Sequence, residues 1–146
     1  MHLFPLLLVL IQISVSTAAI KDNFLFAMEM TCQINKTWEY DVIFREEDWF
    51  QAPDDIGTQQ IGATSSKVAR VHVTGVLIGD FGWHYEPYVV INHTCTHNNK
   101  MIVIIAWLPK VPIDKKWYQV KFSIDLTDRE GAINQATQVK YQQWFG

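Results

Sequence analysis

The chain has 146 residues and a formal net charge of −3, and aromatic residues make up 13% of it. This acidic balance argues against nucleic acid as a partner, because phosphate binding requires clustered basic side chains. The length fits a single domain, and the aromatic content is sufficient to build its core.

The first 19 residues have the organisation of a secretory signal peptide. An apolar run at 3–13 is shorter than the roughly 20 residues that a bilayer span needs, and small residues suited to cleavage follow at 16–19. No Lys or Arg precedes the run, so a buried first helix is the alternative, which Pro5 disfavours. No second long apolar segment is present. We therefore predict a secreted, extracellular protein without a membrane span, whose domain covers residues 20–146.

Most of this domain alternates apolar and polar residues with a period of two, which is typical of half-buried β-strands. Turn residues rich in Asn, Asp, Gly and Pro separate the runs. The runs lie at 24–32, 37–44, 68–78, 86–94, 101–108 and 117–126. They predict six or seven short strands in an all-β, antiparallel sandwich. Residues 131–144 fit either a last strand or a short helix.

The stretch INHTCTH, residues 91–97, places His93, Cys95 and His97 at alternate positions. In a strand, all three side chains would lie on one face. They could then form a zinc site, because zinc binds His and Cys side chains. Half of a disulfide and ordinary strand alternation are the other two interpretations.

A series of short motifs has the order of a known family. The motifs are Cys32 after the first strand, Asp54-Asp55, Pro87-Tyr88 and His93-x-Cys95. Over residues 24–127 the chain resembles the nematode transthyretin-like family, of which it looks like a divergent member. Members often carry two further cysteines, which are missing here, and QINKTW replaces their Gly-Pro-rich stretch after the first cysteine.

The resemblance implies a transthyretin-like antiparallel β-sandwich of two sheets with seven or eight strands. Cys32 and Cys95 match family positions, and in such a sandwich the loops after their two strands lie at the same end. We therefore predict a disulfide between Cys32 and Cys95, which an oxidising compartment favours over a metal site. His93 is then a strand residue, and His97 lies in the loop beyond.

The resemblance also bears on function. It implies a secreted module that binds or recognises rather than catalyses, because family members are linked to recognition of cell surfaces or of lipid-exposing corpses. An extracellular protein or a lipid surface is the expected partner, and the resemblance does not identify the ligand. The alternative is a metal-dependent enzyme or one similar to hydroxyisourate hydrolase, a relative in fold whose C-terminal Tyr-Arg-Gly-Ser is absent from KYQQWFG. A structural role in cuticle is a third class. We predict no catalytic residue, metal or cofactor.

Two groups of side chains could still bind metal. Convergence of three among His72, His84, His93 and His97 would favour an enzyme or a metal site, and dispersion would favour binding. The acidic stretch 45–55 could gather Ca²⁺ through several carboxylates, although a solvated loop is the simpler interpretation.

The loop 79–86 is the predicted contact surface. Its aromatic residues, the proposed anchors, are Phe81, Trp83 and Tyr85. Exposed aromatic side chains anchor partners or membrane surfaces, but they could also fold back over the end of the sandwich. Trp49 and Phe50 could likewise contact a partner or pack against the core.

Two sequons predict N-glycosylation in a secreted chain, at Asn35 in a turn and at Asn92 in a strand. Asn92 should face outward, because His93 and Cys95 occupy the opposite face.

The run MIVIIAWL, residues 101–108, is more apolar than a half-exposed strand requires. It fits a central strand buried on both faces, or an edge strand that joins a second copy of the chain in a homo-oligomer.

Overall fold

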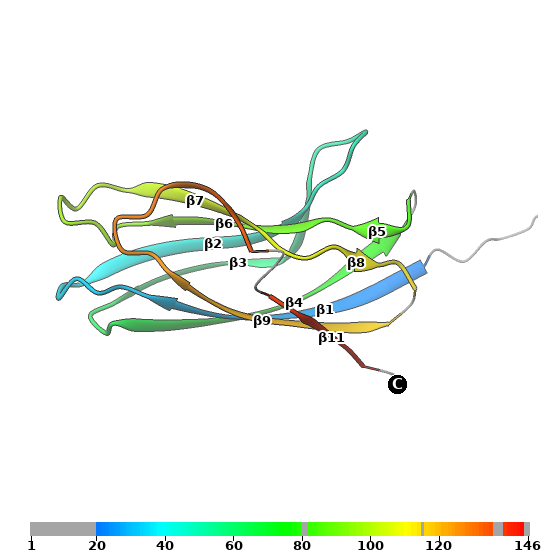
Figure 1. Cartoon of the computed structure of the whole chain (residues 1–146), viewed down its shortest axis with the longest axis horizontal. Helices are drawn as coiled ribbons and strands as arrows, with labels where there is room; N and C mark the ends of the chain where they lie inside the picture. The colour runs from blue at the N-terminus through cyan, green and yellow to red at the C-terminus, as the bar shows by residue number, and fades with distance from the viewer. Residues whose placement is uncertain (1–19, 80–81, 115, 136–138, 145–146) are drawn as a thin grey trace, which may run out of the picture.

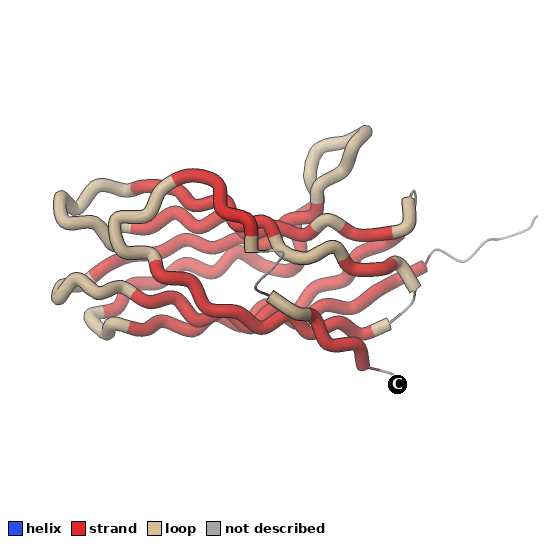
Figure 2. The backbone as a smooth tube through the Cα atoms, viewed as in Figure 1, coloured by secondary structure: helices blue, strands red, loops and turns tan. Residues whose placement is uncertain are grey.

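The computed structural model describes residues 20–79, 82–114, 116–135 and 139–144, and the predicted signal peptide at 1–19 lies outside this part. The described residues form two packed β-sheets and a small third sheet, with no helix among them (Figures 1 and 2). This confirms the predicted all-β sandwich. Within the described residues, no helix is long and apolar enough to cross a membrane.

One sheet has four strands, in the order β11-β9-β1-β4. Their bounds are Ile20–Thr31 for β1, Val68–Gly79 for β4, Trp117–Asp125 for β9 and Tyr141–Trp144 for β11. β1 lies at the centre, antiparallel to β4 along its whole length and parallel to β9. It is therefore held by hydrogen bonds on both sides.

The other sheet has five strands, in the order β10-β7-β6-β2-β3. Their bounds are Trp38–Glu46 for β2, Asp54–Thr64 for β3, Pro87–His93 for β6, Ile102–Trp107 for β7 and Gly131–Asn134 for β10. A third, two-stranded sheet pairs β5 (His84–Tyr85) with β8 (Val111–Pro112).

The structure corrects two details of the prediction. The sheets are mixed rather than purely antiparallel, because β1 pairs in parallel with β9 and β7 with β10. Between the two members of each parallel pair, the chain crosses to the other sheet and returns. Parallel neighbours require such a crossover connection. The described residues also contain more strands than predicted, because the predicted runs do not include β3, β5 and β8. Residues 131–144 follow the strand alternative and supply two strands, β10 and β11.

β7 lies between β6 and β10, inside the five-stranded sheet. The central-strand interpretation of residues 101–108 is therefore correct, and the edge interpretation is wrong. β7 is nevertheless not buried on both faces, because Val103 is partly exposed on the outer face.

The predicted alternation places the core between the two sheets. From β1, Phe24, Phe26, Met28 and Met30 point inward and are buried, and alternate residues of β2 face them from the other sheet. Burying a side chain of this size contributes about 1.5–3 kcal/mol relative to leaving it exposed. The period-two pattern thus identified the inward faces of both strands.

The two sheets approach each other most closely where β3 lies beside β4. A Cβ atom on Gly57 would lie 2.4 Å from the backbone oxygen of Thr74, and one on Gly75 would lie 2.6 Å from the backbone nitrogen of Gly57. Gly57 also has a φ of +74°, which L side chains rarely adopt. Here β3 has two extra residues relative to β2, between the pairs Val42–Gln60 and Phe44–Ile56.

We expect Gly57→Ala to be markedly destabilising, because it combines an unfavourable φ with a collision against backbone that cannot move. Gly131→Ala is the matched control, since Gly131 has a φ of +97° but open space around it. The control should cost about 1–2 kcal/mol, and Gly57→Ala about 2 kcal/mol more. Urea unfolding followed by tryptophan fluorescence measures both. Equal losses would mean that the close approach of β3 and β4 is unimportant.

Candidate functional site

A groove of about 650 Å³ lies at one end of the sandwich. Residues from three separate segments line it: Glu46–Gln51 from the last residue of β2 onward, Gly82–His84 with Glu86 around β5, and Lys110 before β8. We call it the end groove. Trp49, Phe50 and Trp83 all line it, with exposed fractions of 82%, 87% and 86%. The end groove is thus a hollow between two loops whose largest side chains face solvent.

The sheet register brings these loops together. Glu46, the last residue of β2, is paired with Pro87, the first residue of β6, so the chain leaves β2 where it enters β6. The loop after β2 projects from the body of the sandwich near β5 (Figure 1). Backbone hydrogen bonds secure the base, from Glu47 N to the Glu86 carbonyl (3.2 Å) and from Ile113 N to the Trp83 carbonyl (3.1 Å).

Glu86 connects the walls of the end groove. Its carboxylate accepts a hydrogen bond from the Trp49 indole (3.3 Å) and forms an ion pair with Lys110. Within the other loop, the Asp48 carboxylate accepts a hydrogen bond from the backbone of Phe50 (2.9 Å). These contacts give the projecting loop a defined shape while its two aromatic side chains stay exposed.

The end groove is acidic. Among its described lining residues, Glu46, Glu47, Asp48 and Glu86 contribute four carboxylates, against a single lysine, Lys110. The Glu47 carboxylate has no hydrogen bond or ion pair within the described part of the chain, which leaves its oxygens open to a ligand. The arrangement can therefore attract a cation to a surface that also offers aromatic rings.

The predicted anchors are only partly correct. Trp83 is exposed at the end groove, whereas Tyr85 is only 2% exposed and cannot anchor a partner. Phe81 lies outside the described residues. The Tyr85 hydroxyl donates a hydrogen bond of 2.6 Å to Asp22, a fully buried carboxylate on β1. Burial, and then this hydrogen bond, raise the pKa of Tyr85 far above its usual range. Trp83 lies in a bend before β5 and Tyr85 lies within β5, so Trp83 does not share the buried face of Tyr85 although it is only two residues away.

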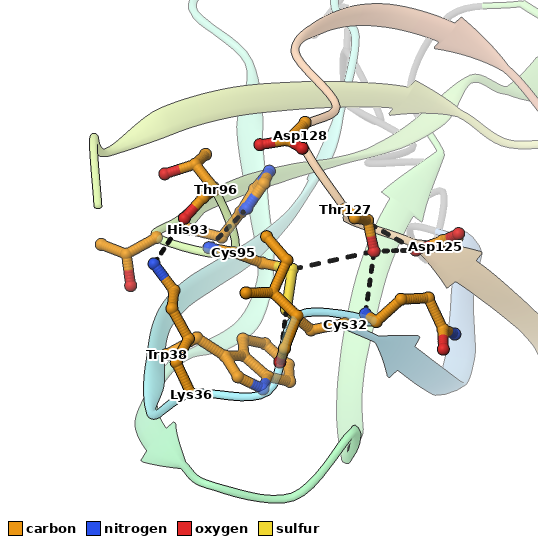
Figure 3. The surroundings of a disulfide bond; sticks show 12 residues. Cys32, Lys36, Trp38, His93, Cys95, Thr96, Asp125, Thr127 and Asp128 are labelled. Carbon is orange, nitrogen blue, oxygen red and sulfur yellow. Dashed lines mark hydrogen bonds between the residues drawn. A yellow bond between two sulfur atoms is a disulfide. The ribbon is translucent and has the colours of Figure 1, made fainter. Parts of the chain in front are cut away.

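The opposite end of the sandwich holds the predicted disulfide (Figure 3). Cys32 follows β1 and Cys95 follows β6, and their Cα atoms lie 5.8 Å apart, so the bond joins one sheet to the other. Both cysteines are fully buried. The two cysteines are separated by 63 positions in sequence, and the cross-link stabilises the fold by about 4 kcal/mol in the chain-entropy treatment.

His93 is buried beside this disulfide. Its Nδ1 accepts a hydrogen bond from the Cys95 backbone (3.2 Å), so the proton resides on Nε2, which lies 2.9 Å from the Arg129 carbonyl. Burial lowers the pKa of His93, and the bond to Arg129 opposes this shift. The neutral imidazole therefore satisfies both of its neighbours.

The other histidines lie apart. His72 is exposed on β4, His84 lines the end groove, and His97 is paired with Asp128 in a loop near the disulfide. Within the described residues, no three His, Cys, Asp or Glu side chains gather in a way that could hold a metal ion. In the acidic stretch, Asp55 instead forms an ion pair of 2.9 Å with Arg45.

Both predicted glycosylation sites are described. Asn35 is exposed in the turn between β1 and β2, and Asn92 is half-buried on β6, on the face opposite the buried His93. The attachment of glycans stays a prediction.

Most of the sandwich matches a known protein family. Residues 27–138 match the family described as "Caenorhabditis elegans protein of unknown function (DUF870)". The chain belongs to this family. The match covers β2 to β10 completely, and with them the end groove and both cysteines. No curated protein matches the chain.

One solved structure is similar, that of a candidate cell adhesion protein from Bacteroides ovatus. The sequences are 8% identical and the TM-score is 0.32, with 87% of this chain and 44% of the other chain covered. The chain thus spans less than half of that protein, and a likeness of this size carries no functional argument.

Sequence reasoning found the parts of the end groove without seeing that they meet. It treated the acidic stretch and the aromatic loop as two separate features, and it did not single out Glu86 or Lys110. The sequence signal that could have indicated the end groove is an aromatic loop directly after β2 and another directly before β6. Only the pairing of Glu46 with Pro87 reveals that both loops lie at the same end.

We expect Tyr85→Phe to lower the free energy of unfolding by about 2–3 kcal/mol, because the buried Asp22 carboxylate loses a hydrogen-bond donor. Tyr40→Phe is the control, since the Tyr40 hydroxyl has no hydrogen bond to any described residue. It should change stability by no more than about 0.5 kcal/mol. Chemical denaturation measures both variants. A loss in Tyr85→Phe no larger than in the control would contradict this account of Asp22.

We expect His93 to make the fold less stable in mild acid. Its pKa in the folded state is below the ordinary value of 6.5, so the unfolded chain takes up the proton first as the pH falls. The free energy of unfolding should therefore decrease below about pH 6.5 until the folded-state pKa is passed. In His93→Gln, which cannot titrate, the decrease between pH 7 and pH 5 should be smaller. Equal slopes for the two proteins in denaturation series would show that His93 is not responsible.

Proposed function

We propose that the protein is a secreted, transthyretin-like module that binds an extracellular protein or lipid surface through its end groove and does not act as an enzyme. The order of the sequence motifs supports the likeness to transthyretin, as does a sandwich of two sheets. A buried disulfide is compatible with secretion, because such bonds persist in oxidising compartments.

A single observation carries the proposal. Three aromatic side chains, each more than 80% exposed, line one groove on a protein whose other aromatic residues largely fill its core. Exposing Trp and Phe forgoes the free energy that their burial contributes elsewhere in the sandwich. Exposed aromatic residues around a concavity are typical of interaction sites, where Trp commonly contributes a large part of the binding energy.

The test removes the rings on both sides of the end groove. We expect Trp49→Ala/Trp83→Ala to reduce binding of the labelled, secreted protein to intact cultured C. elegans cells by about tenfold or more, as two anchoring tryptophans predict. Flow cytometry measures binding to cells, and co-sedimentation measures binding to phosphatidylcholine vesicles.

Trp117→Ala is the matched control, because Trp117 is 49% exposed on β9 and does not line the end groove. It should bind like the unmodified protein, and all variants should be secreted in similar amounts. Undiminished binding by the double variant, or an equal loss in the control, would refute a role for the end groove.

A further inference from the structure

We propose that the end groove recognises an arginine-rich basic segment of an extracellular protein. This inference rests on the proposed function and names the chemistry of its ligand. It combines three features of one surface, namely its charge, its exposed rings and the open hydrogen-bonding capacity of the Glu47 carboxylate.

Charge gives the sign of the ligand. The described lining contains four carboxylates and one lysine. Lys110 is already paired with Glu86. An anionic group entering the end groove would meet repulsion from the remaining carboxylates, whereas a cationic segment would be attracted and steered toward it.

The rings narrow the choice among cations. Trp49, Phe50 and Trp83 present three exposed aromatic side chains, and Trp is the strongest partner for cation–π contacts. The planar guanidinium group of arginine stacks on aromatic faces, whereas the compact and strongly hydrated ammonium group of lysine does so less well. The rings therefore favour arginine over lysine.

The carboxylates favour arginine over a quaternary ammonium group. A trimethylammonium head has no N–H donor, so it can use the rings but cannot form hydrogen bonds with carboxylates. Arginine has five N–H donors in a planar fork that fits a carboxylate through two parallel hydrogen bonds. Glu47 has no such bond within the described residues and is the first candidate to receive one.

The closing experiment measures fluorescence anisotropy of a labelled arginine–glycine repeat peptide mixed with the whole secreted protein. Matched lysine–glycine and glutamate–glycine repeats give the comparison. We expect the arginine peptide to bind most tightly, the lysine peptide more weakly and the glutamate peptide not at all. Binding of the arginine peptide should weaken as salt is added, because exposed charge pairs are screened.

Two charge-matched variants locate the site. Glu47→Gln/Asp48→Asn keeps every aromatic ring and the Asp48 acceptor for Phe50, and should weaken arginine-peptide binding about tenfold. Glu39→Gln/Glu130→Gln removes the same charge at positions that do not line the end groove, and should bind nearly as well as the unmodified protein. Trp49→Ala/Trp83→Ala should also weaken binding of this peptide.

The outcomes separate the ligand class from the function. Equal binding of the arginine and lysine peptides, or an equal loss in the two charge variants, would overturn the inference. The inference would also be overturned if the protein bound cells or phosphatidylcholine vesicles through the two tryptophans but did not bind the arginine peptide. That result would leave the proposed function intact. If removing the tryptophans changes none of these interactions, both the inference and the proposed function are wrong.

Discussion

The stack of Phe26 on Phe44 is the contact on which the sandwich depends. Phe26 belongs to β1 in the four-stranded sheet and Phe44 to β2 in the five-stranded sheet, and their ring centroids lie 4.3 Å apart with the planes inclined by 14°. Each ring is fully buried. Because side chains in a strand alternate between faces, an inward position of these two residues determines which face each of the remaining residues of β1 and β2 occupies.

From this contact the two ends of the sandwich diverge. At one end, the disulfide joins the two sheets and His93 is buried beside it, so a covalent bond holds this end together. At the other end, no covalent bond joins the loops, and the connection relies on Glu86, the short β5–β8 sheet and the bond between Tyr85 and Asp22. Exposed aromatic side chains are concentrated at this second end. The cross-link stabilises the first end, and the second end carries the surface for which we propose a role in recognition.

The fold was largely readable from local pattern. The alternation of Phe24, Phe26, Met28 and Met30 identified the inward face of β1, because the period of a strand does not depend on its neighbours. The direction of pairing was not readable. The parallel neighbours β1 and β9 are separated by most of the chain, and their apolar pattern would serve an antiparallel pair equally well.

The sequence by itself determined the strand faces, the all-β class and, with the family resemblance, the pairing of Cys32 with Cys95. Tertiary structure decided the candidate site. Trp83 and Tyr85 look equivalent as sequence, but only Tyr85 meets a buried carboxylate, which β1 contributes from 63 residues away. The acidic loop and the aromatic loop likewise become one groove only because β2 pairs with β6. Local pattern follows from the backbone geometry of single strands, whereas the site follows from contacts between segments distant in sequence.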